Sequence, residues 1–153
     1  HEVIADADIF IAAAAVADYR PAQCSTEKIK KSREAMSIEL VRCPDILASV
    51  AALDAAPFTV GFAAETEHVD EYAQGKLADK KLDMIIANRV GADLGFDSDE
   101  NAVSVFWHDG ARRFPRADKS QLANELIELI AQHYFAARGA DTQPRLTVIS
   151  TID

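Results

Sequence analysis

The segment "FTVGFAAETEHVDEYAQGKLADKKLDMIIAN", residues 58–88, decides the expected fold. It begins with an apolar run at 58–65, which predicts a buried strand, and it ends with a second short apolar run at 83–88. The stretch between them, 69–82, is acidic at its start and basic at its end, as the helix macrodipole favours. Strand, helix and strand in this order predict an α/β fold with a mainly parallel sheet.

The flanking segments predict further elements of the same fold. Upstream, the apolar run 9–16 predicts a buried strand, and a loop follows it because Pro21 offers no amide hydrogen to a sheet. The other expected elements are a half-exposed strand at 36–42, a helix at 44–56 that begins with Pro44, a hairpin at 102–115 with an Asp109-Gly110 turn, and an amphipathic helix at 118–135. We therefore predict a Rossmann-like layered fold with a β-hairpin. Its N-terminal strand-helix units are expected to be missing, because a buried strand so near the start lacks neighbours.

The composition is typical of one soluble domain. The chain has 153 residues, of which 49% are hydrophobic, and its net charge is −9. No apolar run could cross a membrane and no signal peptide is recognisable, so we expect a cytoplasmic protein without a membrane partner. The acidic balance argues against nucleic-acid binding, and the two cysteines fit free thiols in a reducing compartment. We divide the chain into a domain at 1–137 and a linker and tail at 138–153.

Positive charge gathers in two places of this acidic chain. The loop cations are Lys28, Lys30, Lys31 and Arg33, and all lie in a stretch without hydrophobic periodicity at 22–35. Lys76 and Lys80 are four residues apart in the predicted helix and therefore share a face. Such cations suit a polyphosphate, and a loop that closes over it would exclude water. The plain alternative is that the loop lysines are solvated and the helix lysines complement the macrodipole.

Five motifs occur in a fixed order along the chain. They are "AAVADYRP" at 14–21, "EKIKK" at 27–31, "CPDIL" at 43–47, "VGFAAET" at 60–66 and "ANRV" at 87–90. With these motifs the chain resembles, from Asp8 to Tyr134, bacterial phosphopantothenoylcysteine synthetase, the ligase half of the bifunctional coenzyme A biosynthesis protein. The resemblance implies a CTP-dependent ligase that activates 4′-phosphopantothenate as an acyl-cytidylate, releases pyrophosphate, and transfers the acyl group to L-cysteine with release of CMP. It also implies Mg²⁺ and a homodimer, and flavin mononucleotide (FMN) only in a decarboxylase domain fused upstream.

The resemblance also implies roles for individual residues. It places nucleotide contacts at Asp18, Lys28, Pro44, Asp45, Ile46, Leu47, Phe62, Lys76 and Lys80. Lys28 would be a catalytic flap lysine over the reacting groups, Ala14 and Ala15 would line the substrate site, and no metal ligand is assigned. Elementary chemistry agrees, because the reacting carboxylate is already ionised, so positioning and cations can carry the catalysis. Backbone amides at the helix start near Pro44 would suit an anion or a base edge.

The chain departs from the family pattern in three respects. Arg89 stands where an acid is common, Cys43 stands where an asparagine is common, and the family's first half, with its catalytic asparagine, has no counterpart. We therefore expect this chain to be inactive alone. The competing hypotheses are a non-catalytic nucleotide-binding or dimerisation module and a fragment of a Rossmann-like oxidoreductase. We also predict that a stripe of Val103, Val105 and Trp107 forms a dimer interface, unless the last helix covers it.

Overall fold

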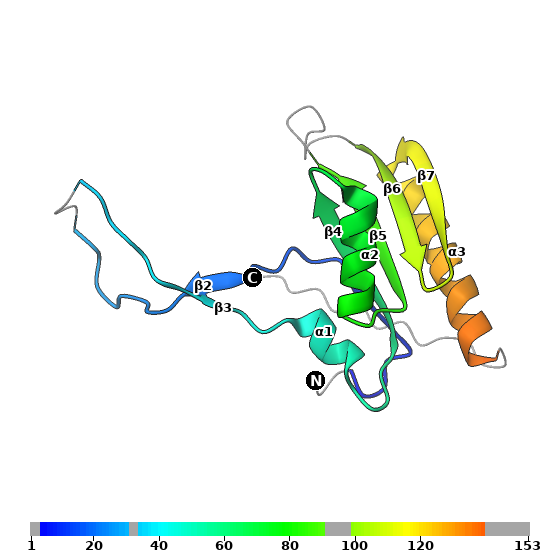
Figure 1. Ribbon diagram of the computed structural model, residues 1–153, viewed down its shortest axis with the longest axis horizontal. Coiled ribbons are helices and arrows are strands. Elements are labelled where there is room, and N and C mark those ends of the chain that lie inside the picture. Colours follow the sequence, from blue (N-terminus) through cyan, green and yellow to red (C-terminus); the bar gives the residue numbers. More distant parts are fainter. Residues whose placement is uncertain (1–3, 31–33, 91–98, 140–153) are drawn as a thin grey trace.

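The computed structural model describes residues 4–30, 34–90 and 99–139 (Figure 1). The elements in chain order are β1 (Ile9–Ala12), β2 (Tyr19–Pro21), β3 (Leu40–Arg42), α1 (Ile46–Ala51), β4 (Phe58–Glu65), α2 (Val69–Asp79), β5 (Met84–Arg89), β6 (Glu100–Trp107), β7 (Gly110–Asp118) and α3 (Lys119–Arg138). Because the predicted tail lies mainly outside the described residues, the domain boundary after residue 137 stays a prediction. Within the described ranges, no helix is long and apolar enough to cross a membrane.

Five strands form the central sheet, in the order β1-β4-β5-β6-β7. β4 pairs in parallel with β1 and with β5, whereas β6 is antiparallel to both β5 and β7. Four of the five strands therefore run in one direction, and β6 with β7 forms the hairpin. The α/β fold predicted from residues 58–88 is confirmed, with β4, α2 and β5 as its parallel βαβ unit.

α2 and the short helix α1 pack on one face of this sheet and α3 packs on the other, so the core consists of two clusters, one on each face (Figure 1). Successive strand side chains point to opposite faces. In β5, Met84 and Ile86 accordingly join the cluster under α3, whereas Ile85 joins the cluster under α2. All three side chains are at most 1% exposed. The continuous apolar character of this strand follows from its burial on both faces.

The β6–β7 hairpin corrects two expectations. Val103 and Val105 are buried in the same cluster as Leu122, Leu126 and Ile130 of α3, so the last helix covers the stripe within one chain. The predicted dimer interface at this stripe was therefore wrong, and the alternative holds. The turn lies one residue earlier than predicted, at His108 and Asp109, because Trp107 pairs with Gly110.

The segments between β1 and β4 differ most from expectation. The first strand is confined to Ile9–Ala12, and the strand expected at 36–42 is confined to Leu40–Arg42. The predicted loop after β1 instead contains β2, which pairs antiparallel with β3. Pro21 is tolerated there because it is the last residue of β2 and belongs to a two-stranded sheet without a further neighbour.

β2, β3 and the residues between them form an arm, defined as residues 18–30 and 34–43. Figure 1 shows the arm extending away from the central sheet. Its exposed large apolar side chains are Tyr19, Ile29, Met36, Ile38 and Leu40, each more than half exposed. A two-stranded ribbon has no second layer to bury such side chains, and a ribbon of this kind is only marginally stable in water by itself.

Candidate functional site

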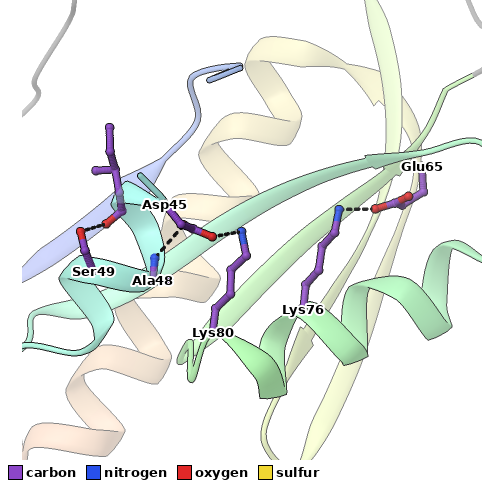
Figure 2. A network of polar contacts seen from close by, with 7 residues as sticks. Asp45, Ala48, Ser49, Glu65, Lys76 and Lys80 are labelled. Atoms are coloured by element: carbon purple, nitrogen blue, oxygen red, sulfur yellow. Dashed lines mark hydrogen bonds and ion pairs between the residues drawn. The ribbon is translucent and has the colours of Figure 1, made fainter. Parts of the chain in front are cut away.

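The start of α1 carries the first polar group of the candidate site. Asp45 is the N-cap of α1, and its Oδ1 accepts a hydrogen bond of 2.9 Å from the backbone amide of Ala48. Its Oδ2 lies 2.9 Å from Lys80 Nζ (Figure 2). The hydrogen bond from the Ala48 backbone amide, and then the contact with Lys80, lower the pKa of the Asp45 carboxyl. Partial burial of the carboxyl opposes this shift. Asp45 is therefore a fixed anion at neutral pH.

This capping arrangement corrects the expected helix start. α1 is six residues long and begins at Ile46, so Pro44 precedes the cap instead of occupying the first helical position. Of the backbone amides at this helix start, which we expected to suit an anion, that of Ala48 donates its hydrogen bond to Asp45. Asp45 and its partner Lys80 are thus the charged groups that the structure places at the start of α1.

The second polar pair lies one helical turn away on α2. Lys76 Nζ donates to Glu65 Oε1 at 2.6 Å, and Glu65 is the last residue of β4. The two α2 lysines point in the same direction, toward carboxylates from two different elements (Figure 2). We call Asp45, Glu65, Lys76 and Lys80 the lysine strip. Such a strip suits an extended anion, because it offers two cations about one helical turn apart on one face.

Gly61 brings α1 close to the sheet beside this strip. A Cβ built on Gly61 would lie 2.8 Å from Leu47 Cδ2 and 3.0 Å from Leu82 Cδ1. Only a glycine leaves room for the α1 leucine at this point of β4. The predicted nucleotide contacts include neither Gly61 nor Glu65, although both lie in the "VGFAAET" motif. The sequence signal that could have indicated this close approach of α1 to β4 is a glycine, Gly61, within a predicted strand.

The other predicted residues are not gathered at the strip. Phe62 is 43% exposed and, by strand alternation, faces the side of α3, opposite to Gly61. Ala14, Ala15 and Asp18 are exposed between β1 and β2. The backbone oxygen of Asp18 accepts from Cys43 N at 2.8 Å, which joins the base of the arm to the "CPDIL" motif. Ile46 is half exposed at the start of α1.

Lys28 and Lys30 lie exposed on the arm, which extends away from the sheet (Figure 1). Lys31 and Arg33 lie outside the described residues. The structure therefore does not bring Lys28 to the lysine strip in this arrangement. Among residues 4–30, 34–90 and 99–139, no group of three metal-binding side chains is found.

The comparison with known families decides the classification. The model of the DNA/pantothenate metabolism flavoprotein C-terminal domain matches residues 1–134, which is most of the chain. The chain belongs to this family. The family also accounts for the ordered motifs from "AAVADYRP" to "ANRV", so the resemblance predicted from them is confirmed.

Two curated relatives of the DNA/pantothenate metabolism flavoprotein family are bifunctional proteins. The chain is 54% identical over 126 residues to the coenzyme A biosynthesis bifunctional protein CoaBC of Vibrio cholerae, covering 80% of the chain and 32% of that protein. It is 48% identical over 132 residues to the same-named protein of Escherichia coli K12, covering 83% of the chain and 32% of that protein. The chain thus spans about a third of the length of these relatives.

Two solved structures resemble the fold of this family member. A crystal structure of the C-terminal domain of a coenzyme A biosynthesis bifunctional protein CoaBC matches with a TM-score of 0.62 and 35% identity, over 82% of this chain and 54% of that one. The DNA/pantothenate metabolism flavoprotein from Streptococcus pneumoniae matches with a TM-score of 0.66 and 21% identity, over 86% and 66%. The second likeness concerns the fold alone.

Proposed function

We propose that this chain is the nucleotide-binding part of a CTP-dependent ligase that joins 4′-phosphopantothenate to L-cysteine. The lysine strip carries the proposal, because two of the lysines assigned to CTP, Lys76 and Lys80, share one face beside Asp45 of the "CPDIL" motif. Membership of a family whose relatives are coenzyme A biosynthesis proteins supports the choice of substrates. In a protein of net charge −9, the two lysines of the strip are cations that can bind the phosphates of a nucleoside triphosphate.

The proposed chemistry has two displacement steps. A carboxylate oxygen of 4′-phosphopantothenate attacks the α-phosphorus of CTP, the bond to the bridging oxygen of the β-phosphate breaks, and pyrophosphate leaves. The amine of cysteine then attacks the acyl carbon, the bond to the cytidylate oxygen breaks, CMP leaves, and the amine loses a proton. The products are 4′-phosphopantothenoylcysteine, CMP and pyrophosphate.

The residues of this chain contribute binding and charge to these steps. Lys76 and Lys80 hold phosphate oxygens, and Lys28 reaches the reacting groups when the arm closes over them. The Mg²⁺ that the resemblance implies would be bound mainly through the phosphates of CTP and would neutralise part of their charge. Because no residue here matches the family's catalytic asparagine, we expect the 153 residues to bind CTP without completing the reaction.

CTP should stabilise the protein that contains this chain more than ATP does. A site with base-edge hydrogen bonds rejects the wrong base because buried polar groups are then left unpaired. At a CTP concentration one hundred times its Kd, the free energy of unfolding should rise by about 2.7 kcal/mol. A thermal-shift titration with both nucleotides measures this, with Lys76→Gln as the variant that loses the CTP response. Equal shifts with CTP and ATP would exclude base recognition.

We propose a homodimer that forms through the arm. The exposed apolar side chains of β3 and its approach, Ile38 and Leu40, support this location, because two arms that pair would bury them. The double variant Ile38→Asp/Leu40→Asp should be a folded monomer in light scattering. The matched control is Ile127→Asp, which places the same charge on an exposed position of α3 and should leave the dimer intact. A wild-type monomer would refute the dimer, and an unchanged dimer in the double variant would refute its location.

The exposed arm also favours a second candidate function, a non-catalytic nucleotide-binding or dimerisation module. The two candidates differ in the effect of Lys28. A module requires the arm only for assembly, whereas the ligase requires Lys28 for turnover.

A further inference from the structure

Glu65 is the more buried carboxylate of the lysine strip, and its partner Lys76 is the more exposed of the two lysines. The side chain of Glu65 is 16% exposed and that of Lys76 is 47% exposed. The backbone of Glu65 is held in the β4–β5 register opposite Arg89, and its carbonyl oxygen accepts from Val90 N at 2.9 Å. Glu65 is therefore a carboxylate fixed to the sheet, whereas Lys76 reaches it on a flexible stem from α2.

The two carboxylates of the strip differ in their other contacts. Asp45 uses one oxygen to cap α1 and the other to contact Lys80, so its loss would also damage the helix start. Within the described part of the chain, the polar contact of the Glu65 side chain is the hydrogen bond from Lys76. A change at Glu65 thus alters the charge beside Lys76 without removing a helix cap.

We propose that Glu65 is an exchangeable counter-ion of Lys76: a polyphosphate takes over the lysine when it binds, and Glu65 takes the lysine back when the polyphosphate leaves. This inference rests on the proposed function, since it requires that the lysine strip binds a polyphosphate. It makes Glu65 a positioning residue that acts through Lys76, and it gives the carboxylate a role in ligand release.

Electrostatics favours exchange over a permanent structural bridge. Because Lys76 is about half exposed, solvent screens its ion pair with Glu65, and the pair contributes little net stability once the lost side-chain freedom is included. A triphosphate carries several negative charges, so it attracts Lys76 more strongly than a single carboxylate does and displaces Glu65 from the ion pair. The displaced Glu65 stays near the bound phosphates because its backbone is fixed in the sheet. Its charge then repels the ligand, so Glu65 lowers affinity and speeds dissociation.

Glu65→Gln in the full-length protein tests this directly. Isothermal titration with inorganic triphosphate and with CTP should show about three- to fivefold tighter binding for both, as expected when one nearby repulsive charge is lost at a half-exposed site. Stopped-flow measurements should show a slower dissociation of the nucleotide. The gain should shrink as salt rises, because salt screens the lost repulsion. It should also be smaller when Lys76→Gln is present.

Two further variants separate the local charge from other effects. Glu65→Asp keeps the charge and should bind triphosphate within about twofold of the wild type. Glu128→Gln removes the same charge from an exposed position on α3, on the other face of the sheet, and should leave binding unchanged. Weaker or unchanged binding by Glu65→Gln, at a wild-type melting temperature, overturns the exchange proposal, as does an equal gain in Glu128→Gln. A wild-type protein that binds neither triphosphate nor CTP overturns the proposed function itself.

Discussion

Lys28→Gln should lower the turnover of the complete ligase about a hundredfold, in the range seen when one group that stabilises transition-state charge is removed. CTP affinity should fall by less than about threefold, because an exposed arm lysine adds little to ground-state binding. The reason is that negative charge develops on the α-phosphate oxygens while the acyl-cytidylate forms, and Lys28 meets that charge only after the arm closes. Steady-state kinetics together with nucleotide titration measures the two effects separately.

Lys30→Gln is the matched control for this prediction. Lys30 lies two residues further along the same arm and is also exposed, and its substitution removes the same charge. Its turnover should stay close to that of the wild type. A Lys28→Gln enzyme with normal turnover would mean that the arm lysines are solvated and that the arm serves assembly alone.

Gly61→Ala should destabilise the protein by about 1–2 kcal/mol and weaken CTP binding. The added methyl group would lie 2.8 Å from Leu47 Cδ2 and 3.0 Å from Leu82 Cδ1, and both distances are too short for carbon atoms. Because Leu82 is buried, the less buried Leu47 side chain is expected to give way, and its displacement would disturb α1, whose N-cap is Asp45. Urea unfolding and CTP titration measure the two consequences.

Gly75→Ala is the matched control for Gly61→Ala. Gly75 lies in α2, and nothing lies within 4 Å of a Cβ built there. Alanine at that position should stabilise the protein by about 0.5–1 kcal/mol, so the same substitution has opposite signs at the two sites. Adding Leu47→Ala to Gly61→Ala should restore part of the CTP affinity, since it removes the clashing atoms. A Gly61→Ala protein as stable as the wild type would show that α1 does not depend on this close approach.

Sequence reasoning correctly predicted those parts of the fold that depend on interactions between residues close together in the chain. Residues 58–88 contain a complete strand-helix-strand unit, so their hydrophobic pattern and charge gradient sufficed. The pairing of β2 with β3 brings Pro21 opposite Leu40, and no local pattern indicates a partner at that separation. The burial of Val103 and Val105 likewise depends on where α3 packs, which the stripe itself does not determine.

In the candidate site, too, features within one helix were predictable from the sequence, whereas contacts between different elements were not. The spacing of Lys76 and Lys80 predicted a shared helical face, and the structure confirms it. Their partners Glu65 and Asp45 come from β4 and from the start of α1, and only the tertiary packing brings them to α2. Gly61 was missed because its importance depends on Leu47, which reaches it from another element.

Product analysis of the complete protein with CTP, 4′-phosphopantothenate and L-cysteine is the decisive measurement. The proposed ligase predicts CMP and pyrophosphate in equal amounts with 4′-phosphopantothenoylcysteine. Without cysteine, it predicts an acyl-cytidylate that accumulates to about one equivalent per active site, since the second displacement lacks its nucleophile. Formation of CDP and inorganic phosphate, or product formation that needs no CTP, would contradict a cytidylate-forming ligase.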